Sequence, residues 1–160
     1  MDRLAVLRDL MPALRDTSRT LLRTGVVRSG LEPLPASEAD MIRAIVREPG
    51  VSPGRLAAEL QMKPSNVSTA LRHLAELGLV QRESDPADRR AGRVLPTPKA
   101  VADSRRIEET WARVLDEVLA ELPDHQAQAL LDAVPALRAL ERALRTRDTA
   151  ADTAAQDGSQ

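Results

Sequence analysis

Residues 64–77 read PSNVSTALRHLAEL and combine two kinds of side chain that an α-helix would separate. The apolar residues recur at spacings of three and four, which is the period of a helix with one buried stripe. They are Val67, Ala70, Leu71, Leu74 and Leu77. The opposite side carries small polar and basic residues, where a solvated helix usually carries Glu and Lys. Short polar side chains let a helix approach another surface closely, so we interpret this side as a contact face.

The segment before this helix has the start signals of another, shorter helix. Ser52 is a good N-cap and Pro53 suits the first helical position, while Val51 can pack on Leu56. Residues 61–63 then leave a three-residue turn between the two helices. Two helices joined in this way form a helix-turn-helix, whose second helix enters the major groove of DNA.

A β-hairpin is predicted directly after the second helix. Gly78 can end that helix in the left-handed conformation, and residues 79–83 alternate like a strand. Residues 84–92 are polar, rich in turn-forming residues and basic toward their end, and residues 93–95 can return as the second strand. The whole stretch therefore predicts a helix-turn-helix followed by a basic wing.

These motifs resemble those of the MarR family of winged-helix transcription regulators, and together they cover about a third of the chain. The set is fairly specific, although each piece alone is weak. The matching pieces are Ser52 to Leu60, Pro64-Ser65, Leu74 to Arg82, Asp85 to Arg90 and Thr97-Pro98. The chain departs from the family pattern at five positions, and at two of them, Thr69 and His73, many members carry Arg. The departures are Lys63, Thr69, His73, Pro96 and Ala100.

Composition indicates a mainly α chain with a small β-hairpin wing, because Ala, Leu, Arg and Glu dominate and strand-forming residues are sparse. We predict a single winged helix-turn-helix domain over residues 1–147. Its DNA-binding lobe spans about 36–98, and its dimerisation helices span about 1–24 and 98–146. Residues 148–160 have no apolar period and are predicted to be a disordered tail.

The segments that flank the lobe carry several helix breakers. Residues 1–23 are predicted to be helical with a break or kink at Pro12, and a linker follows over residues 25–35. Ser37 is predicted to cap the next helix. Pro135 is predicted to bend or split the last one.

The lobe is too small to cover the apolar faces of the flanking helices. We therefore expect the terminal helices of two chains to interlock in a two-fold homodimer, as the family resemblance also implies. The predicted dimerisation residues are Leu4, Leu7, Met11, Leu14, Leu137, Leu140 and Leu144.

The net charge of the chain is −1, but residues 63–99 hold seven basic and four acidic residues. A local positive excess of this kind fits a DNA-binding face. Within it, Asn66 can pair with adenine and Arg72 with guanine, and Lys63 would favour a phosphate at the helix N-terminus. The predicted DNA-binding residues are Lys63, Pro64, Ser65, Asn66, Ser68, Thr69, Arg72, His73, Arg82, Asp88, Arg89 and Arg90.

The resemblance implies that Arg90 enters the minor groove and that Asp88 orients it. An ion pair that stabilises the turn is the alternative for these two residues, and both roles are compatible. Lys99 and His73 are further candidates for phosphate contacts.

Other function classes find little support in the sequence. The two histidines, His73 and His125, lie far apart, so we expect no metal site and no cofactor, and no nucleophile triad or phosphate loop suggests an enzyme. Absence of Cys excludes disulfides and Cys-ligated zinc. No apolar run approaches the roughly 20 residues of a membrane span, and no signal core follows Met1. We expect a soluble, cytoplasmic protein.

The leading hypothesis is a sequence-specific DNA-binding transcription regulator that acts as a repressor and binds a pseudo-palindromic operator as a homodimer. The resemblance also implies a small-molecule effector that releases it. Aliphatic side chains and Arg would hold such an effector, because Trp111 is the only aromatic residue and fits a core position better. The alternative is a winged-helix module that binds a protein partner and no DNA.

Overall fold

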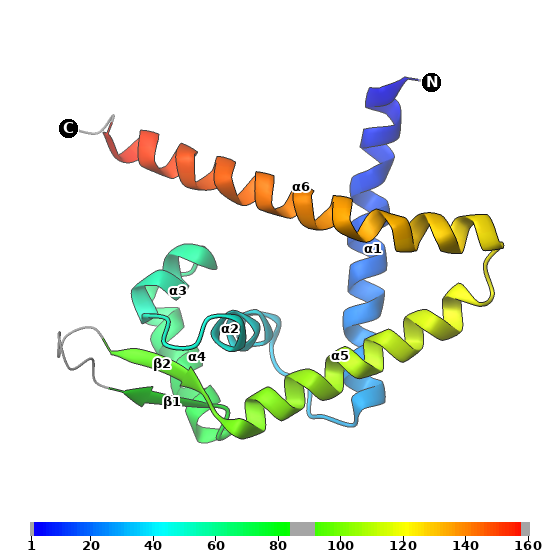
Figure 1. Cartoon of the computed structure of the whole chain (residues 1–160). Helices are drawn as coiled ribbons and strands as arrows, with labels where there is room; N and C mark the ends of the chain where they lie inside the picture. The colour runs from blue at the N-terminus through cyan, green and yellow to red at the C-terminus, as the bar shows by residue number, and fades with distance from the viewer. Residues whose placement is uncertain (1, 84–91, 158–160) are drawn as a thin grey trace. The chain divides into compact units, whose positions relative to one another are not determined.

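The structure is a computed structural model that describes residues 2–83 and 92–157. Its elements follow one another as drawn in Figure 1: α1 (Arg3–Ser29), α2 (Ala36–Arg47), α3 (Pro53–Glu59), α4 (Pro64–Glu76), β1 (Val80–Glu83), β2 (Arg93–Pro96), α5 (Pro98–Leu119) and α6 (Asp124–Asp157). The chain divides into two compact units, residues 1–114 and 115–160. The mainly α fold with one β-hairpin confirms the predicted fold class.

The first unit has one hydrophobic core, to which α2, α3, α4 and β2 all contribute. Complete burial of one such side chain stabilises the fold by roughly 1.5–3 kcal/mol. The largest buried side chains are Met41, Ile45, Leu56, Val67, Leu71, Leu74 and Val94. Because three of them lie on α4, the core fixes which side of that helix faces outward.

The hairpin is tied to the segment that precedes α3. β1 and β2 are antiparallel, with Val80 opposite Pro96. The other edge of β2 forms an isolated bridge with Val51, in which the Val94 N–H donates to the Val51 carbonyl at 3.0 Å. The Gly50 N–H also donates to the Val94 carbonyl, at 2.9 Å. These bonds hold the base of the wing against the helix-turn-helix.

Helices α1 and α5 meet at a close contact within the first unit. The indole Nε1–H of Trp111 donates to the carbonyl of Leu21 at 2.9 Å. A Cβ atom on Gly25 would lie only 1.8 Å from that Nε1, so a larger residue there would have to displace the indole. Trp111 thus packs against α1, but it is only half-buried and lies outside the hydrophobic core, whereas the sequence favours a core position for it.

Helix α1 is longer than predicted and passes through Pro12 without a break. A proline removes one backbone hydrogen bond of a helix, but the turns on both sides can persist. Gly30 ends the helix with a φ of 67°, in the left-handed region that glycine adopts easily. The predicted linker over residues 25–35 therefore begins only after Ser29.

The predicted cap of α2 is wrong, because the helix begins one residue before Ser37. Pro35 is the N-cap, and no side chain caps the helix. The Pro35 carbonyl instead accepts hydrogen bonds from the N–H groups of Glu38 and Ala39, both at 2.9 Å. This start places Glu38 in the first turn, where the helix dipole favours a carboxylate.

In the second unit, α6 is a single helix that is not split at Pro135. It ends at Asp157, whereas the sequence predicts an end near residue 146 and irregular structure from residue 148. Alanine has the highest helix propensity, and the four alanines between residues 150 and 155 favour a longer helix despite the missing apolar period.

Candidate nucleic-acid interface

The helix-turn-helix has the local chemistry that its sequence predicts. Ser52 caps α3, and its Oγ accepts from the Arg55 N–H at 3.2 Å. In the turn, the Met62 N–H donates to the Ala57 carbonyl at 2.9 Å. Gln61 has a φ of 51°, an uncommon left-handed conformation for a residue other than glycine. The sequence carries no signal that identifies Gln61 as the residue of the turn with this left-handed conformation.

The N-terminus of α4 combines two features that attract an anion. Pro64 occupies the first helical position, and Lys63 precedes it as the N-cap residue without a side-chain capping bond. The Lys63 side chain is exposed. The free N–H groups of a helix N-terminus carry partial positive charge, and the nearby ammonium adds to it.

The structure leaves the whole predicted contact face of α4 exposed. The exposed residues are Pro64, Ser65, Asn66, Ser68, Thr69, Arg72 and His73. At about 100° per residue, Ser65, Thr69 and Arg72 lie opposite the buried stripe. Asn66 and His73 lie on one flank of the helix, and Ser68 lies on the other. The outermost line of α4 thus carries two hydroxyl residues and one arginine, and it ends at the exposed Glu76 in the last turn of the helix.

Three residues on this face have different surroundings. The Thr69 Oγ1–H donates to the Ser65 carbonyl within the helix at 3.1 Å. The His73 Nδ1 lies 2.8 Å from Oε2 of Glu38 on α2. For Arg72, no partner occurs among residues 2–83 and 92–157, so its guanidinium is available for an external partner.

Only the base of the predicted wing is described. Arg82 is exposed on β1, opposite Val94 in the strand register. Asp88, Arg89 and Arg90 lie outside the described residues. Their predicted contacts with DNA are therefore predictions from the sequence.

The C-terminal end of α4 is held by residues at the start of α5. The Thr97 Oγ1–H donates to the Gly78 carbonyl at 2.7 Å, and the Lys99 Nζ donates to the Leu77 carbonyl at 2.9 Å. A cation at this position also interacts favourably with the C-terminal end of the helix dipole. Lys99 thus has a partner within the protein, a role that the sequence analysis did not include.

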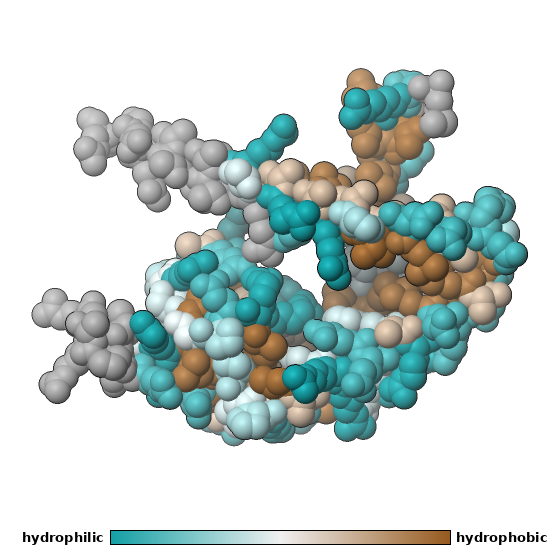
Figure 2. Space-filling model, viewed as in Figure 1, coloured by the Kyte–Doolittle hydropathy of each residue, from teal (hydrophilic) through white to brown (hydrophobic). Residues whose placement is uncertain are grey.

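Two helices expose apolar faces that their own unit does not cover. On α1, Leu4 and Met11 are 63% and 65% exposed, and Leu7 is also exposed, while Leu14 is half-buried. Figure 2 shows such hydrophobic side chains on the surface of the N-terminal part of α1. On α6, the exposed predicted dimerisation residues are Leu137, Leu140 and Leu144. Apolar faces of this extent on a helix are typical of interaction surfaces.

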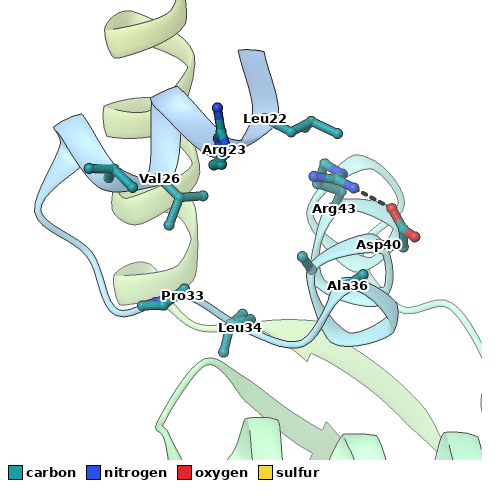
Figure 3. Close-up of a pocket in the computed structure, with 10 residues that line it drawn as sticks. Leu22, Arg23, Val26, Pro33, Leu34, Ala36, Asp40 and Arg43 are labelled. Carbon is teal, nitrogen blue, oxygen red and sulfur yellow. Dashed lines mark hydrogen bonds and ion pairs between the residues drawn. The ribbon is translucent and has the colours of Figure 1, made fainter. Parts of the chain in front are cut away.

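A pocket of about 320 Å³ lies between α1, the segment after it and α2. Figure 3 shows Leu22 and Arg23 on α1 across the pocket from Asp40 and Arg43 on α2, which form an ion pair. The lining is otherwise apolar or small. It comprises Leu22, Arg23, Val26, Val27, Pro33, Leu34, Ala36, Ala39, Asp40 and Arg43. The pocket therefore offers aliphatic contact together with two arginines.

The described residues offer neither a metal site nor a membrane-spanning helix. Within residues 2–83 and 92–157, no group of three His, Asp or Glu side chains could hold a metal ion. The helices of this same part of the chain include none with an apolar stretch long enough to cross a membrane.

Comparison with known proteins identifies the fold and the family. The sequence model of the MarR family matches residues 29–91, which contain α2, α3, α4 and β1. A Thauera aromatica protein described as a transcriptional regulatory protein for the hcr operon is 30% identical over 124 residues, which are 78% of this chain and 70% of that protein. This match extends well beyond the helix-turn-helix, because it covers 124 residues.

Solved structures give the same result. The transcriptional regulator Tm0710 of Thermotoga maritima has a TM-score of 0.67 and 25% identity, and the match covers 86% of this chain and 98% of that one. The transcriptional regulator PcaV of Streptomyces coelicolor, solved in complex with its natural ligand, has a TM-score of 0.52 and 22% identity, with 81% and 89% of the two chains covered. The chain therefore belongs to the MarR family of winged-helix transcription regulators.

Proposed function

We propose that the chain is a sequence-specific DNA-binding repressor that places α4 in the major groove of each half-site of a pseudo-palindromic operator. The observation that carries this proposal is the exposed face of α4. From Pro64 to His73, every exposed side chain is small, polar or basic, and none is acidic. A helix with this surface, fixed by a buried opposite face, is suited to close approach to DNA.

Arg72 is the principal candidate for base recognition. Its guanidinium lies on the outermost line of α4 and has no partner in the described part of the chain. A free guanidinium can bind the O6 and N7 atoms of guanine in a bidentate manner. Asn66 lies on the flank of the helix and is the second candidate, for adenine.

A homodimer is the assembly that the exposed apolar faces favour. Leu4, Leu7 and Met11 on α1 would be buried by a second copy of the chain, and the leucines of α6 would be buried in the same assembly. Two copies related by a two-fold axis would present two α4 helices to two half-sites. Operator symmetry would then follow from protein symmetry.

A small-molecule effector is the proposed ligand of the pocket between α1 and α2. Its volume of about 320 Å³ is at the lower end of the range of ligand sites, which favours a small compound. PcaV, which shares the fold, was solved with its natural ligand. The pocket is lined in part by α2, which packs on α4 in the common core, so a ligand there would lie one helix away from the DNA-binding face.

Selection of binding sites from random double-stranded DNA tests the proposal. We expect a two-fold symmetric motif whose half-sites are separated by about one helical turn of DNA, close to 10 base pairs. A Ser65→Glu variant is the control, because a carboxylate at the outermost line of α4 would repel phosphates and should abolish selection. If the unaltered chain enriches no sequence, it does not read DNA and the proposal is wrong.

A further inference from the structure

Glu38 is a shielded carboxylate beside the candidate DNA-binding face. Its side chain is only 12% exposed, and its Oε2 lies 2.8 Å from the Nδ1 of His73. A carboxylate removed from water is unfavourable unless a hydrogen bond or an opposite charge compensates it. Within residues 2–83 and 92–157, His73 is the side chain that pairs with Glu38. The two residues therefore form an isolated pair between α2 and α4.

The chemistry of this pair determines which imidazole nitrogen remains for another partner. An ionised carboxylate only accepts hydrogen bonds, so the Nδ1 of His73 must carry the proton that lies between them. The Nε2 is then the nitrogen that can bond elsewhere. The carboxylate also fixes the orientation of the ring, much as a carboxylate that is hydrogen-bonded to a metal-bound histidine fixes that ring.

The His73 side chain is 46% exposed, so part of the ring is accessible to a ligand on the flank of α4. A phosphate is a poor partner there, because the Glu38 carboxylate next to the ring repels phosphate oxygens. The uncharged edge of a base does not meet this repulsion. The pair is therefore better suited to recognising a base than to binding the DNA backbone.

We propose that Glu38 is a positioning residue that holds His73 so that its Nε2 contacts one base pair in each half-site. This inference rests on the proposed function of α4 in DNA binding. It assigns a role in sequence recognition to a residue of α2 that itself lies outside the exposed face of α4. In this arrangement α2 contributes indirectly to specificity, through the orientation of one ring.

The test compares four single variants and one double variant of the full-length chain. Affinities are measured for the selected operator and for operators that carry each single base-pair substitution. His73→Ala and Glu38→Ala should both reduce discrimination at the same base pair, by about tenfold, which is a typical loss for one base contact. Glu38→Gln should keep most of the discrimination at that base pair, because the amide oxygen of Gln accepts the same hydrogen bond. The double variant Glu38→Ala with His73→Ala should discriminate no less than His73→Ala alone.

Glu32→Ala is the matched control, because it removes the same type of charged residue from an exposed position just before α2. It should leave discrimination at every base pair unchanged. Thermal unfolding of each variant separates a loss of fold from a loss of recognition.

Two results would overturn the inference. One is that His73→Ala and Glu38→Ala change the affinity equally for all operators. The other is that they alter discrimination at different base pairs. If the unaltered chain binds no sequence selectively, the proposed function itself fails, and this inference fails with it.

Discussion

Arg72 and His73 are adjacent in the sequence, yet the structure gives them different environments. Arg72 is on the outermost line of α4, and His73 is bonded to Glu38 on the flank. We expect Arg72→Ala to abolish preference at one base pair per half-site and to weaken operator binding by roughly 1–3 kcal/mol. Arg105→Ala, an exposed arginine on α5, is the control that removes an equal charge.

Equilibrium binding to operators substituted at single base pairs measures the effect of Arg72→Ala. If the variant loses the same affinity for every sequence, Arg72 binds phosphate and not a base. An unchanged selected motif would also contradict the assignment.

The sequence predicted which residues of α4 are exposed, because apolar periodicity fixes the buried side of a helix. It did not predict the partners of His73 and Lys99. These bonds join His73 to Glu38 and Lys99 to Leu77, which are 35 and 22 residues away. Such pairings depend on how the helices pack, and periodicity within one segment carries no information about them.

Substitutions at two glycines test how the backbone conformation of the helix-turn-helix affects its stability. Gly78 has a φ of 68°, and a Cβ atom there would meet nothing within 4 Å, so Gly78→Ala adds backbone strain and no clash. We expect this variant to lower the free energy of unfolding by about 1–2 kcal/mol. Gly54 lies within α3, where a Cβ atom would also meet open space. We expect Gly54→Ala to raise the free energy by up to about 0.5–1 kcal/mol.

Denaturant unfolding of both variants under identical conditions measures these two changes. Their opposite signs are the central expectation. If Gly78→Ala leaves the free energy of unfolding unchanged or raises it, the end of α4 does not depend on a left-handed residue. If Gly54→Ala lowers it, the expectation for α3 is wrong.

The ends of helices were harder to predict than their existence. Ser37 looks like an N-cap in the sequence, but it already lies inside α2, whose first turn is closed by bonds from the N–H groups of Glu38 and Ala39 to the Pro35 carbonyl. Pro12 is predicted to break or kink its helix and Pro135 to bend or split its helix, and neither interrupts it, because both lie inside continuous helices. A local signal identifies where a helix can end, whereas packing and neighbouring residues decide whether it does.

The exposed apolar face of α1 leads to a prediction about assembly. Leu7 and Met11 are four residues apart and lie on the same side of the helix. Replacing both with Glu should convert the proposed dimer to monomer or aggregate, because two carboxylates cannot be buried in an apolar interface without partners. Sedimentation velocity and DNA binding measure the result. Ala5→Glu with Ala13→Glu places the same charges on about the opposite side of the helix and is the control.

If the Leu7 and Met11 variant stays dimeric and binds its operator normally, α1 is not part of the interface. If the control loses the dimer as well, the effect is one of added charge in general.

The distribution of charge leads to a prediction about salt. The chain has a net charge of −1, so attraction to DNA must come from local basic residues and not from the total. Lys63 and Arg82 in each of two copies, together with the wing arginines, suggest on the order of 4 to 8 phosphate contacts, and hence a slope of log affinity against log salt of roughly −4 to −7. Titrations of the selected operator at several salt concentrations measure this slope. A slope near zero would favour the alternative in which the winged helix binds a protein partner.

The contact between Trp111 and α1 makes the protein its own optical reporter. Trp111 is the one tryptophan in a chain without tyrosine or phenylalanine, so all of its intrinsic fluorescence comes from a single indole. That indole rests on Gly25 and bonds the Leu21 carbonyl, and the next residue, Leu22, lines the pocket. Any event that moves this turn of α1 must change the polarity around the ring. Emission wavelength and quenching by iodide would therefore follow entry of the proposed ligand in real time, without an attached dye.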